Sequence, residues 1–244
     1  MLRPRVTPSR LQHQHQPLAG NSLGVLCWNV QKLTREPHFQ HGLAMLTERY
    51  ATSLLLLQEA RLAPMGDPWL EDWSWAVSPN MQTRTHLFGV LTAGQCAFDD
   101  VRPLLSQSRE LRFATHKSLI LTRHPLPGDG VLLVVNMHAI NFVHAGLFLK
   151  EMELLRAELL RHAGPLIVAG DFNVWSRQRR LYLRRFCRAV GLRQAVMENA
   201  HHVKSYLHQP LDFIFYRDLY LRSAEAINMP GVSDHNPIYA RFLL

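Results

Sequence analysis

The segment Leu166–Trp175 constrains the fold of this chain most, because it joins an apolar run to two chemically useful side chains. Its first five residues, LIVAG, predict a buried strand. In an extended chain alternate side chains share a face, so Asp171 and Asn173 point the same way while Phe172 enters the core. A carboxylate that orients water and an amide that holds an oxygen form half of a hydrolytic site. The alternative is a turn in which both only satisfy backbone amides.

The order of apolar segments predicts an α/β protein with mixed sheets. The run at 53–57 contains four leucines, which indicates burial on both faces of a sheet. The strand pair 117–122 and 130–136 reads as a hairpin, whereas helices around 37–50 and 148–159 act as crossovers. Two packed mixed sheets with helices outside accommodate both features. Further strands are expected at 23–28, 74–77, 88–91, 101–105, 166–170, 211–216, 219–224 and 238–242, a short helix at 69–75, and a basic amphipathic helix after 176.

Length and composition fit one large domain. The chain has 244 residues, of which 47% are hydrophobic and 19% charged, as in ordinary globular proteins. Residues 1–22 are basic and contain His and Gln, and we expect a disordered arm there. The absence of a linker or of a composition change after it predicts a single domain over 23–244.

Charge and cysteine content limit the class of partner and the compartment. A net charge of +8 favours an anionic partner, although many basic proteins have none. The three cysteines, Cys27, Cys96 and Cys187, are odd in number and form no CxxC pair, which argues against disulfides and structural zinc. No apolar run has the length of a membrane span, and no secretory signal is recognisable. We expect a cytoplasmic monomer.

Polar side chains stand at the ends of six predicted strands. Buried polar groups there are costly unless they serve one another or a bound ion, so six of them argue for one shared site. Carboxylates and an amide oxygen without cysteine suit Mg²⁺ or Mn²⁺, and protonated histidines stabilise a phosphorane. The pattern predicts phosphoester hydrolysis without assigning roles. The residues are Asn29, Glu59, His138, Asp171 with Asn173, Asp212, and Asp234 with His235.

The motifs resemble those of the endonuclease/exonuclease/phosphatase superfamily, the group of DNase I. The resemblance runs from Leu23 to Phe242 and includes Trp28-Asn29, Gln58-Glu59, Gly170-Asp-Phe-Asn173, Leu211-Asp212-Phe and Ser233-Asp-His235 in family order. A more specific resemblance, carried by VNMHAINF, AGDFNVWSR and PLDFIFYR, is to the bacterial YafD-like branch. It implies a four-layer α/β sandwich and a phosphoesterase that uses a divalent metal.

The resemblance also implies residue roles. Glu59 is expected as the principal metal ligand, with Asn29 and Asp234 close to the ion. Asp171 is expected to orient or deprotonate water, and Asn173 to hold that water or a phosphate oxygen. Three further residues are expected to be catalytic. His235 would contact the scissile phosphate, and Asp212 would hold the imidazole ring of His235. The third is His138, at a position where abasic-site enzymes carry tyrosine.

Four residues are candidates for substrate binding. Lys117 matches a basic phosphate contact of the family, and Asn141 follows the strand that delivers His138. Trp175 offers a stacking face, and Arg177 starts an arginine-rich helix face, although that face also reads as a solvated surface. Nucleic acid is the expected substrate. The alternatives are a phosphatase or lipid phosphodiesterase, and a non-catalytic nucleic-acid-binding module on the same fold.

Overall fold

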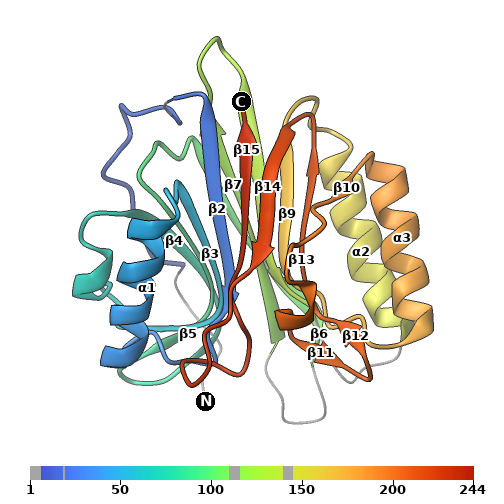
Figure 1. Cartoon of the computed structure of the whole chain (residues 1–244), viewed down its shortest axis with the longest axis horizontal. Helices are drawn as coiled ribbons and strands as arrows, with labels where there is room; N and C mark the ends of the chain where they lie inside the picture. Colours follow the sequence, from blue (N-terminus) through green and yellow to red (C-terminus); the bar gives the residue numbers. More distant parts are fainter. Residues whose placement is uncertain (1–6, 19, 110–115, 140–144) are drawn as a thin grey trace.

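The computed structural model describes residues 7–18, 20–109, 116–139 and 145–244. Two mixed β-sheets pack face to face, with one helix on the outer side of the first and two on the outer side of the second (Figure 1). This arrangement confirms the expected four-layer α/β sandwich. Within the described part of the chain, no helix has the length and apolarity needed to cross a membrane.

The first sheet has seven strands in the order β1-β4-β5-β3-β2-β15-β14. Strands β2 and β3 are parallel, and the other pairs are antiparallel. Helix α1 (Pro37–Arg49) covers it. The short helix expected at 69–75 is wrong beyond its first two residues: the 3-10 helix η1 ends at Leu70 (Pro68–Leu70), and Ser74 already begins a strand. The strands are β1 (Ser9–Arg10), β2 (Ser22–Asn29), β3 (Leu54–Leu62), β4 (Ser74–Gln82), β5 (Leu87–Gly94), β14 (Tyr220–Ala226) and β15 (Ile238–Leu243).

The second sheet has six strands in the order β10-β13-β9-β8-β7-β6, of which β8 and β9 are parallel. Helices α2 (Ala145–Leu159) and α3 (Arg177–Val190) pack on it. The strands are β6 (Asp100–Arg109), β7 (His116–Pro125), β8 (Val131–His138), β9 (Leu166–Asp171), β10 (Arg193–Gln194) and β13 (Asp212–Arg217). Between β10 and β13 lie the 3-10 helix η2 (Ala200–His202) and the hairpin of β11 (Ser205–Tyr206) and β12 (Gln209–Pro210).

Three apolar layers hold these elements together. The central layer lies between the sheets, where fully buried side chains such as Leu56 and Ile167 meet. A second layer joins α1 to the first sheet through residues such as Phe39, and a third joins α2 and α3 to the second sheet. Strands that are apolar on both faces can fill two layers at once, which explains their uninterrupted hydrophobic runs.

A buried amide pair connects the two sheets beside the strand ends. Gln58 Nε2 donates to Asn136 Oδ1 at 2.7 Å. Asn136 Nδ2 in turn donates to the carbonyl oxygen of Leu91 at 2.8 Å. Both amides have 0% exposure. Because these polar groups satisfy one another, the pair fixes how β3 and β8 face each other without an unpaired buried group.

The expected disorder of residues 1–22 is wrong for the described part of that arm. Strand β1 pairs with β4, and the Leu18 side chain is only 3% exposed. Leu18 N donates to Pro125 O at 3.0 Å, and Ala97 N donates to Gln16 O at 2.7 Å. The backbone groups at the edge of β4 need partners, and the arm supplies them.

Strand β3 continues past the point where the leucine run predicts its end. The register with β5 shifts between Leu57 and Ala60, so Glu59 lies on a β-bulge and not at a strand end. Its φ of 54° belongs to the left-handed region, which is uncommon for a non-glycine residue. A bulge re-aims a side chain, and here it changes the direction of the Glu59 carboxylate.

Candidate active site

Four of the predicted side chains, each at the first or last residue of a strand, meet at one edge of the sandwich. In the second sheet, Asp171 pairs in register with His138 on one side and with Asp212 on the other. In the first sheet, Asn29 ends β2, and its side chain reaches across to Asp171. The predicted convergence of these side chains is therefore present in the structure.

Gly170 allows Asp171 to occupy its position. Its φ is +140°, and a Cβ atom there would lie 1.9 Å from the carbonyl oxygen of Met137. No side chain fits that space without moving β8 away from β9.

We expect Gly170→Ala to lower the free energy of unfolding by roughly 3 kcal/mol or more, since it adds backbone strain to the clash. Urea denaturation would measure the change. Gly146→Ala is the matched control, because Gly146 lies in α2 with nothing within 4 Å of an added Cβ. If the Gly170→Ala protein were as stable as the control, β8 could move away from the added Cβ atom at little cost in free energy.

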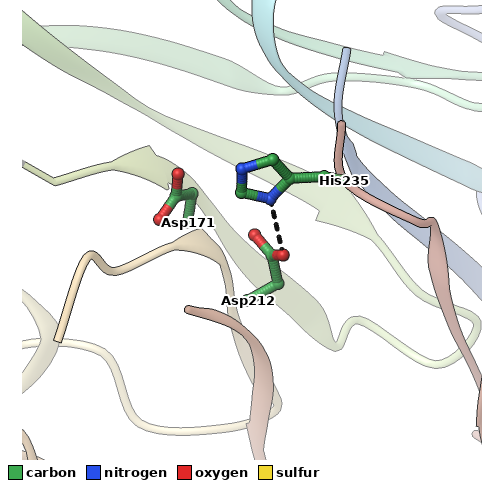
Figure 2. A group of neighbouring side chains, drawn as sticks. All are labelled: Asp171, Asp212 and His235. Carbon is green, nitrogen blue, oxygen red and sulfur yellow. Dashed lines mark hydrogen bonds and ion pairs between the residues drawn. The ribbon is translucent and has the colours of Figure 1, made fainter. Parts of the chain in front are cut away.

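Asp212 and His235 form a buried carboxylate–histidine pair. The ring of His235 points toward the Asp212 carboxylate (Figure 2), and its Nδ1 lies 2.7 Å from Asp212 Oδ2. Both side chains are less than a tenth exposed. The backbone around His235 is also held, because Trp28 Nε1 donates to His235 O at 2.8 Å. Ser233 Oγ donates to Asn29 O at 2.9 Å, which ties the same loop to the end of β2. Asp212 therefore leaves the other ring nitrogen of His235 available to a ligand.

The electrostatics of this pair favour the imidazolium form. Burial is the largest single influence and by itself would lower the pKa of His235. The charge and the hydrogen bond of Asp212, with the charges of Asp171 and Asp234, outweigh burial and raise the pKa from 6.5 to about 9. Because the folded-state pKa is the higher one, this pair stabilises the metal-free protein fully below about pH 6.5, and the contribution is lost as the pH rises through about 9.

We expect Asp212→Asn to lower the pKa of His235 by about 1–3 pH units, because the main counter-charge is removed while burial remains. NMR titration of the histidine ring in EDTA would measure it free of any bound cation. Asp218→Asn, at an exposed turn, is the control. An unchanged pKa in Asp212→Asn would mean that Asp212 does not hold the imidazolium.

Asp171 is the hub of a second group of contacts. Its Oδ2 accepts from Asn29 Nδ2 at 3.1 Å and lies 3.5 Å from His138 Nε2. Its Oδ1 accepts from the backbone N of Asn173 at 3.0 Å. Asn173 Nδ2 donates to Ala139 O at 3.1 Å. Asp171 is 2% exposed and Phe172 is fully buried below it, as strand alternation predicts. These bonds fix the direction of both Asp171 oxygens.

Glu59 faces this group from the first sheet. Its Oε1 lies 3.8 Å from His138 Nε2, and its Oε2 lies 3.8 Å from Lys32 Nζ. A quarter of its side chain is exposed, in contrast to the buried Asp171. Glu59 therefore places a negative charge where the site opens to solvent.

The donor set fits a hard divalent cation. Asp171, Asp212 and His235 offer atoms within 4.8 Å of one another, and Asp212 Oδ1 is buried with no hydrogen-bond partner among the described residues. His235 is a poor ligand, because its Nδ1 is engaged by Asp212 and its raised pKa keeps it protonated near neutral pH. Oxygen atoms of the carboxylates and of Asn29 are therefore the better candidates.

Asp234 is not one of the three residues of this compact group. Its Oδ2 accepts from Lys204 Nζ at 3.1 Å, and its side chain is 45% exposed. The expected role of Asp234 as a metal ligand stays a prediction. The contact also brings Lys204, which sequence patterns did not single out, beside the loop that carries His235.

The structure places two of the four candidate substrate-binding residues. Trp175 is half-buried, and its ring meets Tyr206 edge-on at 5.9 Å, whereas Arg177 is exposed at the start of α3. Lys117 lies in β7, but its side chain is outside the described atoms, and Asn141 is outside the described residues.

Arg179 is a residue that sequence reasoning missed. It is 1% exposed, its guanidinium donates to Asn173 O at 3.0 Å, and it lies over the rings of Phe148 and Trp175. It thus supports the Asn173 backbone from below. The spacing of arginines along α3 does not show that Arg179, and not one of the others, is the buried one.

A pocket of about 420 Å³ adjoins the carboxylate–histidine pair. Asp212 lines it together with His201 and His208. Its size lies within the range of small-ligand sites.

The fold is the DNase I-like α/β sandwich. A model of the Endonuclease/Exonuclease/phosphatase family matches residues 26–235, and the chain belongs to that family. A UPF0294 protein of Erwinia tasmaniensis is 35% identical over 227 residues, which cover 91% of this chain and 82% of the relative. UPF0294 protein YE0917 of Yersinia enterocolitica is 34% identical over 90% of this chain and 83% of the relative. These relatives are YafD-like, in agreement with the motif resemblance.

Solved structures share the fold at low sequence identity. An endonuclease/exonuclease/phosphatase family protein from Leptotrichia buccalis superposes with a TM-score of 0.70 at 13% identity, covering 91% of this chain and all (100%) of that one. D. rerio TDP2 complexed with a single-strand DNA product gives 0.66 at 15% identity, covering 92% and 100%. The 3′ phosphatase NExo from Neisseria bound to a product DNA hairpin gives 0.65 at 17% identity, covering 91% and 100%.

Proposed function

We propose that this protein is a divalent-metal-dependent phosphodiesterase that acts on nucleic acid. The observation that carries the proposal is the buried Asp212–His235 pair beside Asp171, at an edge where two sheets bring carboxylates together. Buried, charged groups in this number are costly to a fold and are typical of catalytic sites. Membership of the family supports phosphoester hydrolysis as the reaction class.

Glu59 and Asn29 would hold the cation, with Asp234 near it. When bound, Mg²⁺ or Mn²⁺ would polarise a phosphoryl oxygen and offset developing negative charge. A quarter of the Glu59 side chain is exposed, so a hydrated cation can reach its carboxylate from solvent.

The chain's own residues would handle the water and the phosphate. Asp171, fixed by Asn29 and by the Asn173 backbone, would orient the water and accept its proton. The free nitrogen of the protonated His235 would donate to a phosphate oxygen, with Asp212 holding the ring. Asn173 would hold the water or a phosphate oxygen, and His138 would donate to the phosphate from the opposite side.

Nucleic acid is the substrate that the chain's charge favours. The net charge of +8 attracts phosphate polymers, and Trp175 offers a stacking surface beside the site, with Arg177, Lys117 and Asn141 as further contacts. Inositol phosphates and anionic lipids respond to the same field and define the runner-up, a phosphatase or lipid phosphodiesterase. The cytoplasmic location and the monomeric state remain predictions.

A hydrolysis panel tests the proposal. Purified protein would be assayed with Mg²⁺ or Mn²⁺ and with EDTA on DNA, RNA, an abasic duplex, bis-p-nitrophenyl phosphate, p-nitrophenyl phosphate, inositol phosphates and sphingomyelin. We expect metal-dependent cleavage of diesters that Glu59→Ala abolishes. Preference for monoesters or for sphingomyelin would favour the runner-up, and oligonucleotide binding without any turnover would favour a binding module.

A further inference from the structure

The solvent face of helix α3 carries three arginines, Arg184, Arg185 and Arg188, which we call the arginine row. The helix sequence RQRRLYLRRFCRAV contains six arginines and no acidic residue. Its buried face consists of Leu183, Phe186 and Val190, together with Arg179, whereas the arginine row is exposed. Packing therefore uses the apolar face, and the row takes no part in it.

No described side chain pairs with the arginine row. Elsewhere on the same side of the molecule arginines are neutralised: Arg156 pairs with Glu153 at 2.7 Å, and Arg161 pairs with Glu158 at 2.9 Å, both on or near α2. The positive charge of the arginine row is thus concentrated and uncompensated among the described residues, although acidic side chains are present on the neighbouring helix.

Helix stability does not account for this composition. Arg180, Arg184 and Arg188 follow one another at four-residue spacing, where like charges repel across the helix surface. The first turn also lacks the acidic residues that the helix dipole favours and contains Arg177, Arg179 and Arg180. An anionic ligand would offset both effects.

The helix connects the row to the proposed active site. It begins at Arg177, four residues after Asn173, and runs along the outer side of the second sheet (Figure 1). At 1.5 Å per residue, Arg184 and Arg188 lie about 10 and 16 Å from Arg177 along the axis. In double-stranded DNA each strand advances about 3.4 Å per nucleotide along the helix axis, so the row would reach phosphates of such a strand roughly three to five nucleotides from the helix start.

We propose that the arginine row binds the phosphodiester backbone of a nucleic acid strand on one side of the bond to be cleaved. The inference rests on the proposed function and makes polymeric nucleic acid, not a mononucleotide, the preferred substrate. An anionic membrane would meet the same charge. A membrane-bound helix, however, inserts an apolar face into the membrane, and the apolar face of α3 is buried against the sheet. Beside the row, the one large apolar side chain of α3 that is exposed is Leu181, at 46%.

The test is a triple variant, Arg184→Gln, Arg185→Gln and Arg188→Gln, since glutamine keeps helix propensity. Its binding to a labelled single strand of about 20 nucleotides would be measured by fluorescence anisotropy in EDTA over a salt series. Three lost phosphate contacts should reduce the slope of log K against log salt by about 2 and weaken binding roughly tenfold or more at low salt. Hydrolysis of bis-p-nitrophenyl phosphate should equal that of the wild type, because this small diester does not reach the row.

The control removes the same charge from other exposed arginines, through Arg49→Gln, Arg222→Gln and Arg241→Gln. An unchanged slope in the row variant, or an equal loss in the control, would overturn the inference. So would loss of binding to phosphatidylserine vesicles with oligonucleotide binding retained. If the wild-type protein hydrolysed no diester, the proposed function would be wrong. The binding measurements in EDTA would still show whether the arginine row binds nucleic acid.

Discussion

Replacing Asp171 by Asn is expected to reduce kcat for a phosphodiester by about 10²–10⁴-fold, the usual contribution of a general base or of its water-orienting equivalent. The substitution keeps the size of the side chain and the contact with Asn29, but it removes the charge that receives the proton. Steady-state kinetics on bis-p-nitrophenyl phosphate would measure the loss. KM should change little, because Asp171 would act on the water and not on the bound substrate.

The matched control is Asp129→Asn, which makes the same chemical change in the exposed turn between β7 and β8. Its kcat should equal that of the wild type. Thermal unfolding would show whether Asp171→Asn remains folded. A folded Asp171→Asn protein with wild-type kcat would remove Asp171 from the mechanism.

Glu59→Gln should raise the metal concentration needed for half-maximal activity by at least about 100-fold, since loss of even an outer-shell partner costs 10–100-fold in metal affinity. Glutamine keeps the shape of the side chain and the demand for the left-handed backbone at this bulge, so the lost charge is the main change. Calorimetric titration of Mn²⁺ and activity at increasing Mn²⁺ would both report it, and high metal should restore part of kcat.

Glu48→Gln, on the exposed side of α1, serves as the control for loss of one negative charge. If Glu59→Gln kept the wild-type metal midpoint in both measurements, Glu59 would not be a ligand. The cation would then have to be held by Asp171 and Asp212, whose oxygens lie in the compact buried group.

Local sequence patterns predict most strands because apolar runs such as LIVAG and the leucines of β3 leave few other structures open. The same patterns predict that polar residues follow these runs. They do not determine which strand ends face each other, because that depends on the register of two separate sheets. Asp212 begins β13 of the second sheet, whereas His235 lies 23 residues further on, in the loop before β15 of the first sheet. Only the family resemblance paired them.

The features that the sequence did not predict depend on contacts between distant parts of the chain, which local patterns do not show. The bulge at Glu59 arises from the register with β5. The arm around Leu18 is ordered by the free edge of β4 and by the β7 terminus. Arg179 is buried because Phe148 and Trp175 provide ring faces for its guanidinium.

The central claim is that this edge of the sandwich hydrolyses phosphodiesters with a divalent metal. The most direct measurement is hydrolysis of bis-p-nitrophenyl phosphate by protein freed of metal with EDTA and then supplied with Mn²⁺ or Mg²⁺, beside Asp171→Asn purified in parallel. We predict no turnover in EDTA, recovery on addition of metal, and a large loss in the variant. Turnover that persists in EDTA, or that is equal in Asp171→Asn, would contradict the account.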